Sequence, residues 1–385
     1  MMHGAALVDR VRARLADSGD EPSAAHVAAA LKAEGRLVSD AAVLEVVSSL
    51  RSQIEGLGPL AALVRDPAVT DVLVNGPDDV WVDCADGLRR TQVRFPDEAA
   101  VRRLAQRLAA TGGRRLDDAM PYVDARLPDG IRVHAVLPPI APRSTCLSLR
   151  IPRRRVFTLD ELMGAGSVTP LAAEFLGALV ASRASFVVTG CAGAGKTTLL
   201  SCLLGRAPSR ERIVLVEDSA ELRPEHPHVV RLEARPPNVE GAGEVTLRDL
   251  VRQALRMRPD RLVVGEVRGP EIVDLLAALN TGHEGGCGTL HANSAREVPA
   301  RVEALAVAAG LDRAAVHSQL SAGLEVVVHM GRDRDGARRV REIGVTAPSG
   351  QGLTLVEPAL TFIEGEALDG RGRARLDQLL ARSLS

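Results

Sequence analysis

Apolar residues in the second half of the chain recur in two patterns that predict alternating strands and helices. Three short runs are continuously apolar: Phe186–Thr189, Ile213–Val216 and Leu262–Val264. Such runs are typical of strands that are covered on both faces of a sheet. Helical periodicity marks the segments between and after these runs, over about 196–206, 246–257, 270–280 and 294–309. The alternation predicts a largely parallel sheet with helices packed against it.

The first half of the chain carries shorter and more mixed patterns. Residues 1–55 are rich in Ala, Val and Leu between charges, which predicts short helices with one buried face formed by Val43, Leu44, Val47, Leu50 and Ile54. An amphipathic helix is expected over 97–110. Strand-like runs flank that helix at 70–74, 80–82, 132–137 and 145–151. Together these elements predict a small α/β domain over residues 56–150.

A proline followed by three arginines (Pro152–Arg155) indicates a linker over residues 151–157. The second domain is then expected over 158–385. Its first two helices are predicted by a capping box at Thr158–Glu161 and by Thr169 followed by proline. From Glu325 onward the pattern predicts three further strands and then a basic helix near 371–383.

Composition narrows the classes of function. The 385 residues include 48 basic and 49 acidic side chains, for a formal net charge of −1. This balance and the seven aromatic residues argue against a dedicated nucleic-acid binder, which needs basic excess or a stacking surface. The five scattered cysteines form no CxxC pair, which argues against a zinc ribbon and favours a reducing compartment. Without a signal peptide or an 18-residue apolar run, a cytoplasmic protein is expected.

The strongest chemical signal is a phosphate-binding loop with the pattern GxxxxGKT. It follows the strand at 186–189 and precedes an apolar helix, which is the context that the motif requires. Glycines let backbone N–H groups surround phosphate oxygens, while Lys196 would reach the β- and γ-phosphates and Thr197 would bind Mg²⁺. The expected nucleotide-binding residues are Gly190, Gly193, Ala194, Gly195, Lys196, Thr197 and Thr198.

Acidic residues follow two of the predicted strands. Glu266 ends the strand at 261–266 and would hold the metal, through water, or orient the attacking water. Glu217 and Glu221 follow the strand at 213–216 and are candidates for water activation, with Asp218 between them. From spacing alone, a strand cap and a solvated turn remain the respective alternatives.

The segment from Gly282 to His291 is rich in glycine and contains two histidines, His283 and His291. Imidazole groups bind phosphate or relay its presence, although a loop with structural histidines is the alternative. A separation of eight residues does not form a helical metal pair, so zinc is not expected.

Taken in order, four segments resemble one family, the ATPases of type II and type IV secretion and of type IV pilus assembly. They are GAGKTT (193–198), VLVEDSAEL (214–222), LRMRPDRLVVGEVRG (255–269) and TGHEGGCGTLHANS (281–294). Two further segments are most similar to the branch that serves Flp (tight-adherence) pili and conjugation-type transporters: NGPDDVWV (75–82) and DARLPDGIRVHAVLPP (124–139). The resemblance covers residues 55–345.

The resemblance implies a PAS-like N-terminal α/β domain hinged to a RecA-like ATPase domain, with ATP between them. It also implies a homo-hexameric ring that acts with Mg²⁺ on an inner-membrane platform protein and touches the membrane only peripherally, at its cytoplasmic face. Lys196 and Thr197 would be the Walker A pair and Glu266 the Walker B carboxylate. The acidic box would include Glu217 and Glu221, and the histidine box His283 and His291. Arginines of the N-terminal domain would reach the phosphates; they fall here at Arg126, Arg132, Arg143 and Arg150.

Some positions differ from the family pattern. Cys191 and Ala194 replace the usual loop residues, and Cys287 lies in the histidine box. The missing tetracysteine motif argues against the zinc-bearing branch of type II secretion. The expected function is ATP hydrolysis that drives Flp pilus assembly or secretion. The alternatives are a conjugation-type ATPase that moves protein or DNA, a RecA-like motor acting on DNA, and a nucleotide switch that does not hydrolyse. For each arginine, an ordinary surface residue also remains an alternative interpretation.

Overall fold

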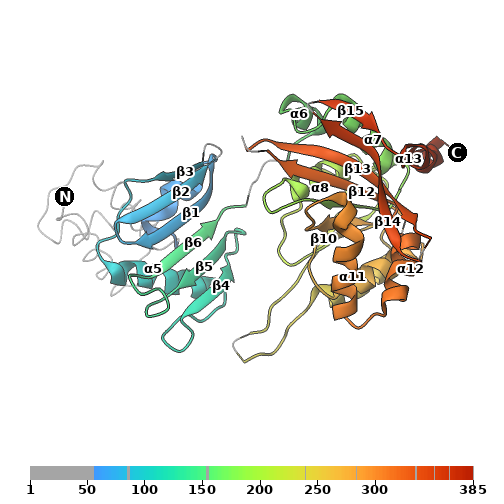
Figure 1. Ribbon diagram of the computed structural model, residues 1–385. Helices are drawn as coiled ribbons and strands as arrows, with labels where there is room; N and C mark the ends of the chain where they lie inside the picture. The colour runs from blue at the N-terminus through green and yellow to red at the C-terminus, as the bar shows by residue number, and fades with distance from the viewer. Residues whose placement is uncertain are drawn as a thin grey trace, which may run out of the picture. The chain divides into compact units, whose positions relative to one another are not determined.

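The protein divides into two compact units, residues 1–153 and residues 154–385 (Figure 1). The computed structural model describes residues 56–84, 87–152, 156–238, 240–282, 284–333, 336–350, 352–363 and 365–384. The helices expected within residues 1–55 lie outside the described residues. Each unit is built around its own sheet and its own core.

The first unit contains a six-stranded antiparallel sheet in the order β3-β2-β1-β6-β5-β4. Its strands are β1 Val69–Gly76, β2 Asp79–Cys84, β3 Gly87–Arg90, β4 Tyr122–Arg126, β5 Arg132–Val136 and β6 Cys146–Arg150. A short turn of helix, η1 Gly58–Leu60, and α4 Ala61–Arg65 precede β1. The strands alternate buried and exposed residues, so one face of the sheet contributes to the core.

The predicted amphipathic helix is α5 Glu98–Thr111. Asp97 begins it as the N-cap, because its side chain accepts a hydrogen bond from the Ala100 N–H at 2.7 Å. The expected stripe is buried: Val101, Leu104, Ala105 and Leu108. This stripe packs with the inward residues of the sheet in one core.

The second unit contains a nine-stranded sheet in the order β15-β14-β13-β12-β7-β11-β10-β8-β9. Its strands are β7 Phe186–Thr189, β8 Ile213–Glu217, β9 Val229–Glu233, β10 Arg261–Val267, β11 Cys287–Leu290, β12 Val326–Arg332, β13 Arg338–Pro348, β14 Thr354–Ile363 and β15 Glu366–Asp369. The six strands from β12 to β9 are parallel, and β13, β14 and β15 extend the sheet antiparallel.

Helices cover both faces of this sheet, which confirms the interpretation of the continuously apolar strands (Figure 1). One core layer includes α6 Leu159–Gly164, α7 Pro170–Ala181, α8 Lys196–Leu204 and α13 Arg373–Leu380. The other includes α9 Leu247–Ala254, α10 Glu271–Leu279, α11 Val298–Ala308 and α12 Arg313–Gly323. Successive strand residues alternate between the layers: Val263 packs in the first, and Leu262 and Val264 in the second.

The predicted α/β fold class, with a RecA-like second unit, is confirmed, but the predicted number of strands in the tail is wrong. In the part of the tail that the structure describes, four strands follow Glu325 instead of three. Of these four strands, β15 lies at the edge of the sheet and has no buried residue, so its sequence pattern is the weakest. An edge strand with only one partly buried residue, Ala367, carries too short a hydrophobic period for a pattern to detect.

Candidate functional site

The phosphate loop connects the end of β7 to the start of α8. Three of its glycines have left-handed backbone angles: φ is +149° at Gly190, +71° at Gly193 and +93° at Gly195. A Cβ at Gly190 would also lie 2.4 Å from the carbonyl oxygen of Met330 on β12. Glycine is therefore required by conformation at three positions and by a close backbone approach at one. The side chain of Ala194, between them, is fully buried.

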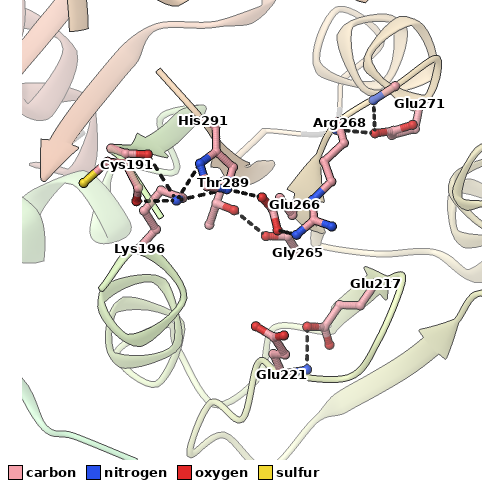
Figure 2. Close-up of polar contacts among 12 residues, drawn as sticks. Cys191, Lys196, Glu217, Glu221, Gly265, Glu266, Arg268, Glu271, Thr289 and His291 are labelled. Atoms are coloured by element: carbon pink, nitrogen blue, oxygen red, sulfur yellow. Dashed lines mark hydrogen bonds and ion pairs between the residues drawn. The ribbon is translucent and has the colours of Figure 1, made fainter. Parts of the chain in front are cut away.

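Lys196 is buried beneath this loop, with 7% of its surface exposed. Its Nζ donates hydrogen bonds to the carbonyl oxygens of Gly190 and Cys191, at 3.1 and 3.0 Å (Figure 2). Nζ also lies 3.4 Å from Nε2 of His291. Burial lowers the pKa of Lys196, while the charge of Glu266 opposes that effect. Loop carbonyls thus hold the ammonium group inside the glycine-rich loop.

Sheet order brings the predicted chemical groups together at one edge. Parallel strands end at the same edge, so residues that follow neighbouring strands become neighbours themselves. The phosphate loop follows β7, His291 follows β11, and Glu266 lies near the end of β10. His291 Nε2 lies 2.5 Å from Oε1 of Glu266, and Arg268 binds the other carboxylate oxygen (Figure 2). Lys196, His291 and Glu266 therefore form one continuous set of contacts.

The charges in this set shift the pKa values of its members. Burial alone would raise the pKa of Glu266, but Arg268, His291 and Lys196 together hold it below its usual value. Burial and the neighbouring Lys196 lower the pKa of His291. Near neutral pH, Glu266 is therefore a carboxylate and His291 a neutral imidazole.

The donor set fits magnesium in the form that accompanies a nucleotide. Within the described residues, no group of three His, Cys, Asp or Glu side chains forms a metal site by itself. Mg²⁺ usually binds one or two protein oxygens and completes its shell with phosphates and water. Oε1 of Glu266 is buried and accepts no hydrogen bond of normal geometry from the described residues, despite the nearby His291. Thr197 and Glu266 are therefore the oxygens expected to hold this ion.

Glu217 occupies the last position of β8 and is almost fully buried. Its Oε1 accepts hydrogen bonds from the backbone N–H groups of Glu221 and Leu222, at 2.9 and 2.8 Å. A Cβ on Gly265 would lie only 2.6 Å from Cγ of Glu217, so the glycine before Glu266 makes room for this side chain. These contacts favour a positioning role for Glu217 in the acidic loop. Water activation by Glu217 or Glu221 stays a prediction.

Replacing Glu217 gives a stability prediction. Glu217→Ala leaves two backbone N–H groups without an acceptor, so we expect the free energy of unfolding to fall by about 2 kcal/mol. Burial raises the pKa of Glu217. Its stabilising contribution is therefore present below the usual carboxyl range and is lost as pH rises through the raised pKa. Glu217→Gln keeps an acceptor oxygen without titrating.

Urea unfolding at pH values of about 3.5 and about 7.5, on either side of the usual carboxyl pKa, measures both effects. We expect the Gln variant to gain stability relative to the wild type as pH rises. Equal stability of the Ala variant and the wild type at both values would show that the hydrogen bonds of Glu217 do not support the loop.

The four predicted arginines of the first unit do not form a single group. Arg126 pairs with Arg132 across β4 and β5, and Arg132 pairs with Arg150 across β5 and β6. Directly opposed residues point to the same face, so these three form a row on the face away from the core. Arg150 is also held by Asp71 at 3.0 Å. Arg143 lies in the loop joining the other ends of β5 and β6, so the structure separates it from the row.

Two residues of the predicted histidine box need a separate statement. His283 lies outside the described residues. Cys287 is buried within β11, and burial raises the pKa of its thiol to about 12. A thiol in this environment stays protonated and unreactive.

Sequence reasoning missed Arg268 and Thr289. Arg268 lies two positions after Glu266, and residues two apart on a strand point to the same face. This spacing is the signal in the sequence that could have identified Arg268 as a partner of Glu266. Thr289 donates a hydrogen bond to the carbonyl oxygen of Gly265 at 2.6 Å and so ties β11 to the residue before Glu266 (Figure 2). No signal in the sequence identified that contact.

Comparison with known proteins places the chain in a family. The sequence profile described as "Type II/IV secretion system protein" matches residues 53–359, which is most of the chain. The chain belongs to this family. The resemblance inferred from the four segments is thereby confirmed.

Two relatives within the type II/IV secretion family are informative. A putative conjugal transfer protein of Mycobacterium tuberculosis is 58% identical over 315 residues, covering 80% of this chain and 90% of the relative. The type IV secretion system protein PtlH of Bordetella pertussis is 33% identical over 299 residues, covering 70% of this chain and 88% of the relative.

Two solved structures share the fold of this chain. The ATPase DotB of Legionella pneumophila aligns with a TM-score of 0.53 and 17% identity, covering 84% of this chain and 85% of DotB. The pilus retraction motor PilT, solved with bound ADP, aligns with a TM-score of 0.52 and 18% identity, covering 84% of this chain and 86% of PilT. In the described part of this family member, no helix has the length and apolar character needed to cross a membrane.

Proposed function

We propose that this protein hydrolyses ATP with Mg²⁺ and couples the reaction to a pilus or secretion machine. The observation that carries the proposal is the contact of Lys196 with His291, and of His291 with Glu266, beside a glycine-rich loop. A buried cation and a carboxylate that both contact one imidazole suit a polyphosphate with its metal better than any uncharged ligand.

Each residue has a defined task in this proposal. Lys196 moves from the loop carbonyls to the β- and γ-phosphates when the nucleotide arrives. Glu266 orients the attacking water, while neutral His291 bonds the terminal phosphate and links it to Glu266. When bound through Thr197 and Glu266, Mg²⁺ would neutralise charge on the phosphate oxygens. Arginines of the first unit, led by the row Arg126, Arg132 and Arg150, would add donors from their own or a neighbouring copy.

The proposed assembly is a homo-hexameric ring at the cytoplasmic face of the inner membrane. There it acts on a platform protein, touches the membrane only peripherally and binds no nucleic acid directly. Assembly of a Flp (tight-adherence) pilus is the preferred process, because the segments at 75–82 and 124–139 are most similar to that branch.

A conjugation-type ATPase is the second candidate, and one observation favours it. The relative with 58% identity bears the description of a putative conjugal transfer protein. Deleting the gene separates the two processes, because loss of surface pili supports the first and loss of DNA transfer supports the second.

Phosphate release by the purified protein tests the proposed chemistry. We expect steady ATP hydrolysis in Mg²⁺, loss of that activity in excess EDTA and recovery when Mg²⁺ is restored. DNA should leave the rate unchanged, and the active species should have six times the mass of the chain. Stoichiometric ATP binding without phosphate release would contradict the proposal and identify a nucleotide switch.

A further inference from the structure

The antiparallel pair of strands β12 and β13 packs directly on the phosphate loop. β12 lies beside β7 in parallel register, with His329 opposite Thr189. Beyond that point β12 runs past the loop, where the Met330 carbonyl closes on Gly190. The side chain of Arg338, at the start of β13, covers Gly195: its Cδ lies 3.5 Å from the position that a Cβ would take on that glycine. The end of β12 is therefore part of the wall of the nucleotide site.

Arg332 is the last residue of β12 and lies at the middle of the loop. Its Nη1 is 3.9 Å from the position that a Cβ would take on Gly193. The side chain is exposed, and within the described residues its guanidinium makes no ion pair and no side-chain hydrogen bond. The adjacent carboxylate of Asp333 instead binds Arg339 and Arg341. Arg332 thus places a positive charge that no described carboxylate compensates beside a glycine of the phosphate loop.

The order of strands in the sheet decides which part of a bound nucleotide the guanidinium of Arg332 faces. The loop follows β7, which lies between β11 and β12. His291 and Glu266 lie on the β11 side, where the terminal phosphate and the metal are expected. Arg332 lies on the β12 side, away from the reacting end. A nucleotide whose terminal phosphate faces Glu266 therefore presents its inner phosphates towards Arg332.

We propose that Arg332 is a nucleotide-binding residue that contacts the phosphates shared by ATP and ADP. The assignment rests on the proposed function of the loop and deepens it by adding a second cation to Lys196. Arginine suits this position, because its planar fork donates two parallel hydrogen bonds to phosphate oxygens. The contact is made in both nucleotide states, so it strengthens binding without favouring ATP over ADP.

The test measures affinity directly, without turnover. Fluorescent ADP and a fluorescent non-hydrolysable ATP analogue are titrated in Mg²⁺ against the full chain and its variants. For Arg332→Ala we expect both affinities to fall by about tenfold, since a lost charge-assisted hydrogen bond has that effect. Arg332→Lys keeps the charge but not the fork and should recover part of the loss. Arg375→Ala removes an exposed arginine from α13 and should change neither affinity.

The outcomes separate this inference from the proposed function. If the wild type binds neither nucleotide, the proposed function fails and the inference fails with it. If the wild type binds both and Arg332→Ala binds them equally well, only the inference is overturned. Loss of affinity for the ATP analogue alone would overturn it too, because Arg332 would then contact the terminal phosphate. Thermal unfolding of Arg332→Ala should match the wild type, since the side chain is exposed.

Discussion

Lys196→Ala should abolish ATP hydrolysis, with a fall of at least about a hundredfold in the rate of phosphate release. The ammonium group is already held within the loop by the carbonyl oxygens of Gly190 and Cys191, so binding a nucleotide needs only a short movement. Burial also lowers the pKa of Lys196, which shows that the charged form lacks full solvation there and would gain from phosphate oxygens. Nucleotide affinity should fall as well, so steady-state phosphate release measures the loss of hydrolysis and titration with fluorescent ADP measures the loss of binding.

Two further variants make this result specific. Lys196→Arg keeps the positive charge, but a broad guanidinium does not fit where the ammonium group of the buried Lys196 contacts two carbonyl oxygens, so activity should stay low. Arg375→Ala again provides the surface control. Full ATPase activity in Lys196→Ala would show that the loop is not the hydrolytic site.

Glu266→Gln should separate binding from hydrolysis. We expect the rate of phosphate release to fall by about a hundredfold or more, while ADP affinity changes little. The amide keeps an oxygen that can accept the hydrogen bond from Arg268, so the local structure is retained. The amide lacks the negative charge of Glu266, which raises the pKa of His291. The same charge would orient the attacking water and hold the metal. Single-turnover hydrolysis compared with ADP titration provides the measurement.

An exposed carboxylate on the same unit gives the matched control. Glu174 on α7 is exposed, and Glu174→Gln should keep wild-type rates and affinities. An equal loss of hydrolysis in both variants would point to a general effect of charge. A Glu266→Gln protein that hydrolyses ATP at the wild-type rate would remove Glu266 from the proposed chemistry.

Continuously apolar interior strands were predictable, but the interior strand β11 was not, because Cys287–Leu290 was interpreted as part of a glycine-rich segment. Edge strands were not predictable either. The continuously apolar runs within β7, β8 and β10 are buried on both faces, and such burial favours apolar side chains at successive positions. The edge strand β15 is not buried, so its sequence is free to be polar and leaves no pattern. The end of α5 was placed within one residue, because an N-cap and a glycine mark helix termini locally.

The sequence by itself determined the phosphate loop, because that motif is local. Consecutive residues of one loop hold Lys196, and glycine stands at the loop positions whose backbone angles require it. It also identified Glu266 and His291 as separate candidates. Only the tertiary structure brought these two together, since their contact depends on β10 and β11 being neighbours in the sheet. The same holds for Arg332, which is one arginine among many until the pairing of β12 with β7 places it beside Gly193. Local conformation is encoded in adjacent residues, but a site assembled across strands is decided by strand order, which spacing along the chain does not reveal.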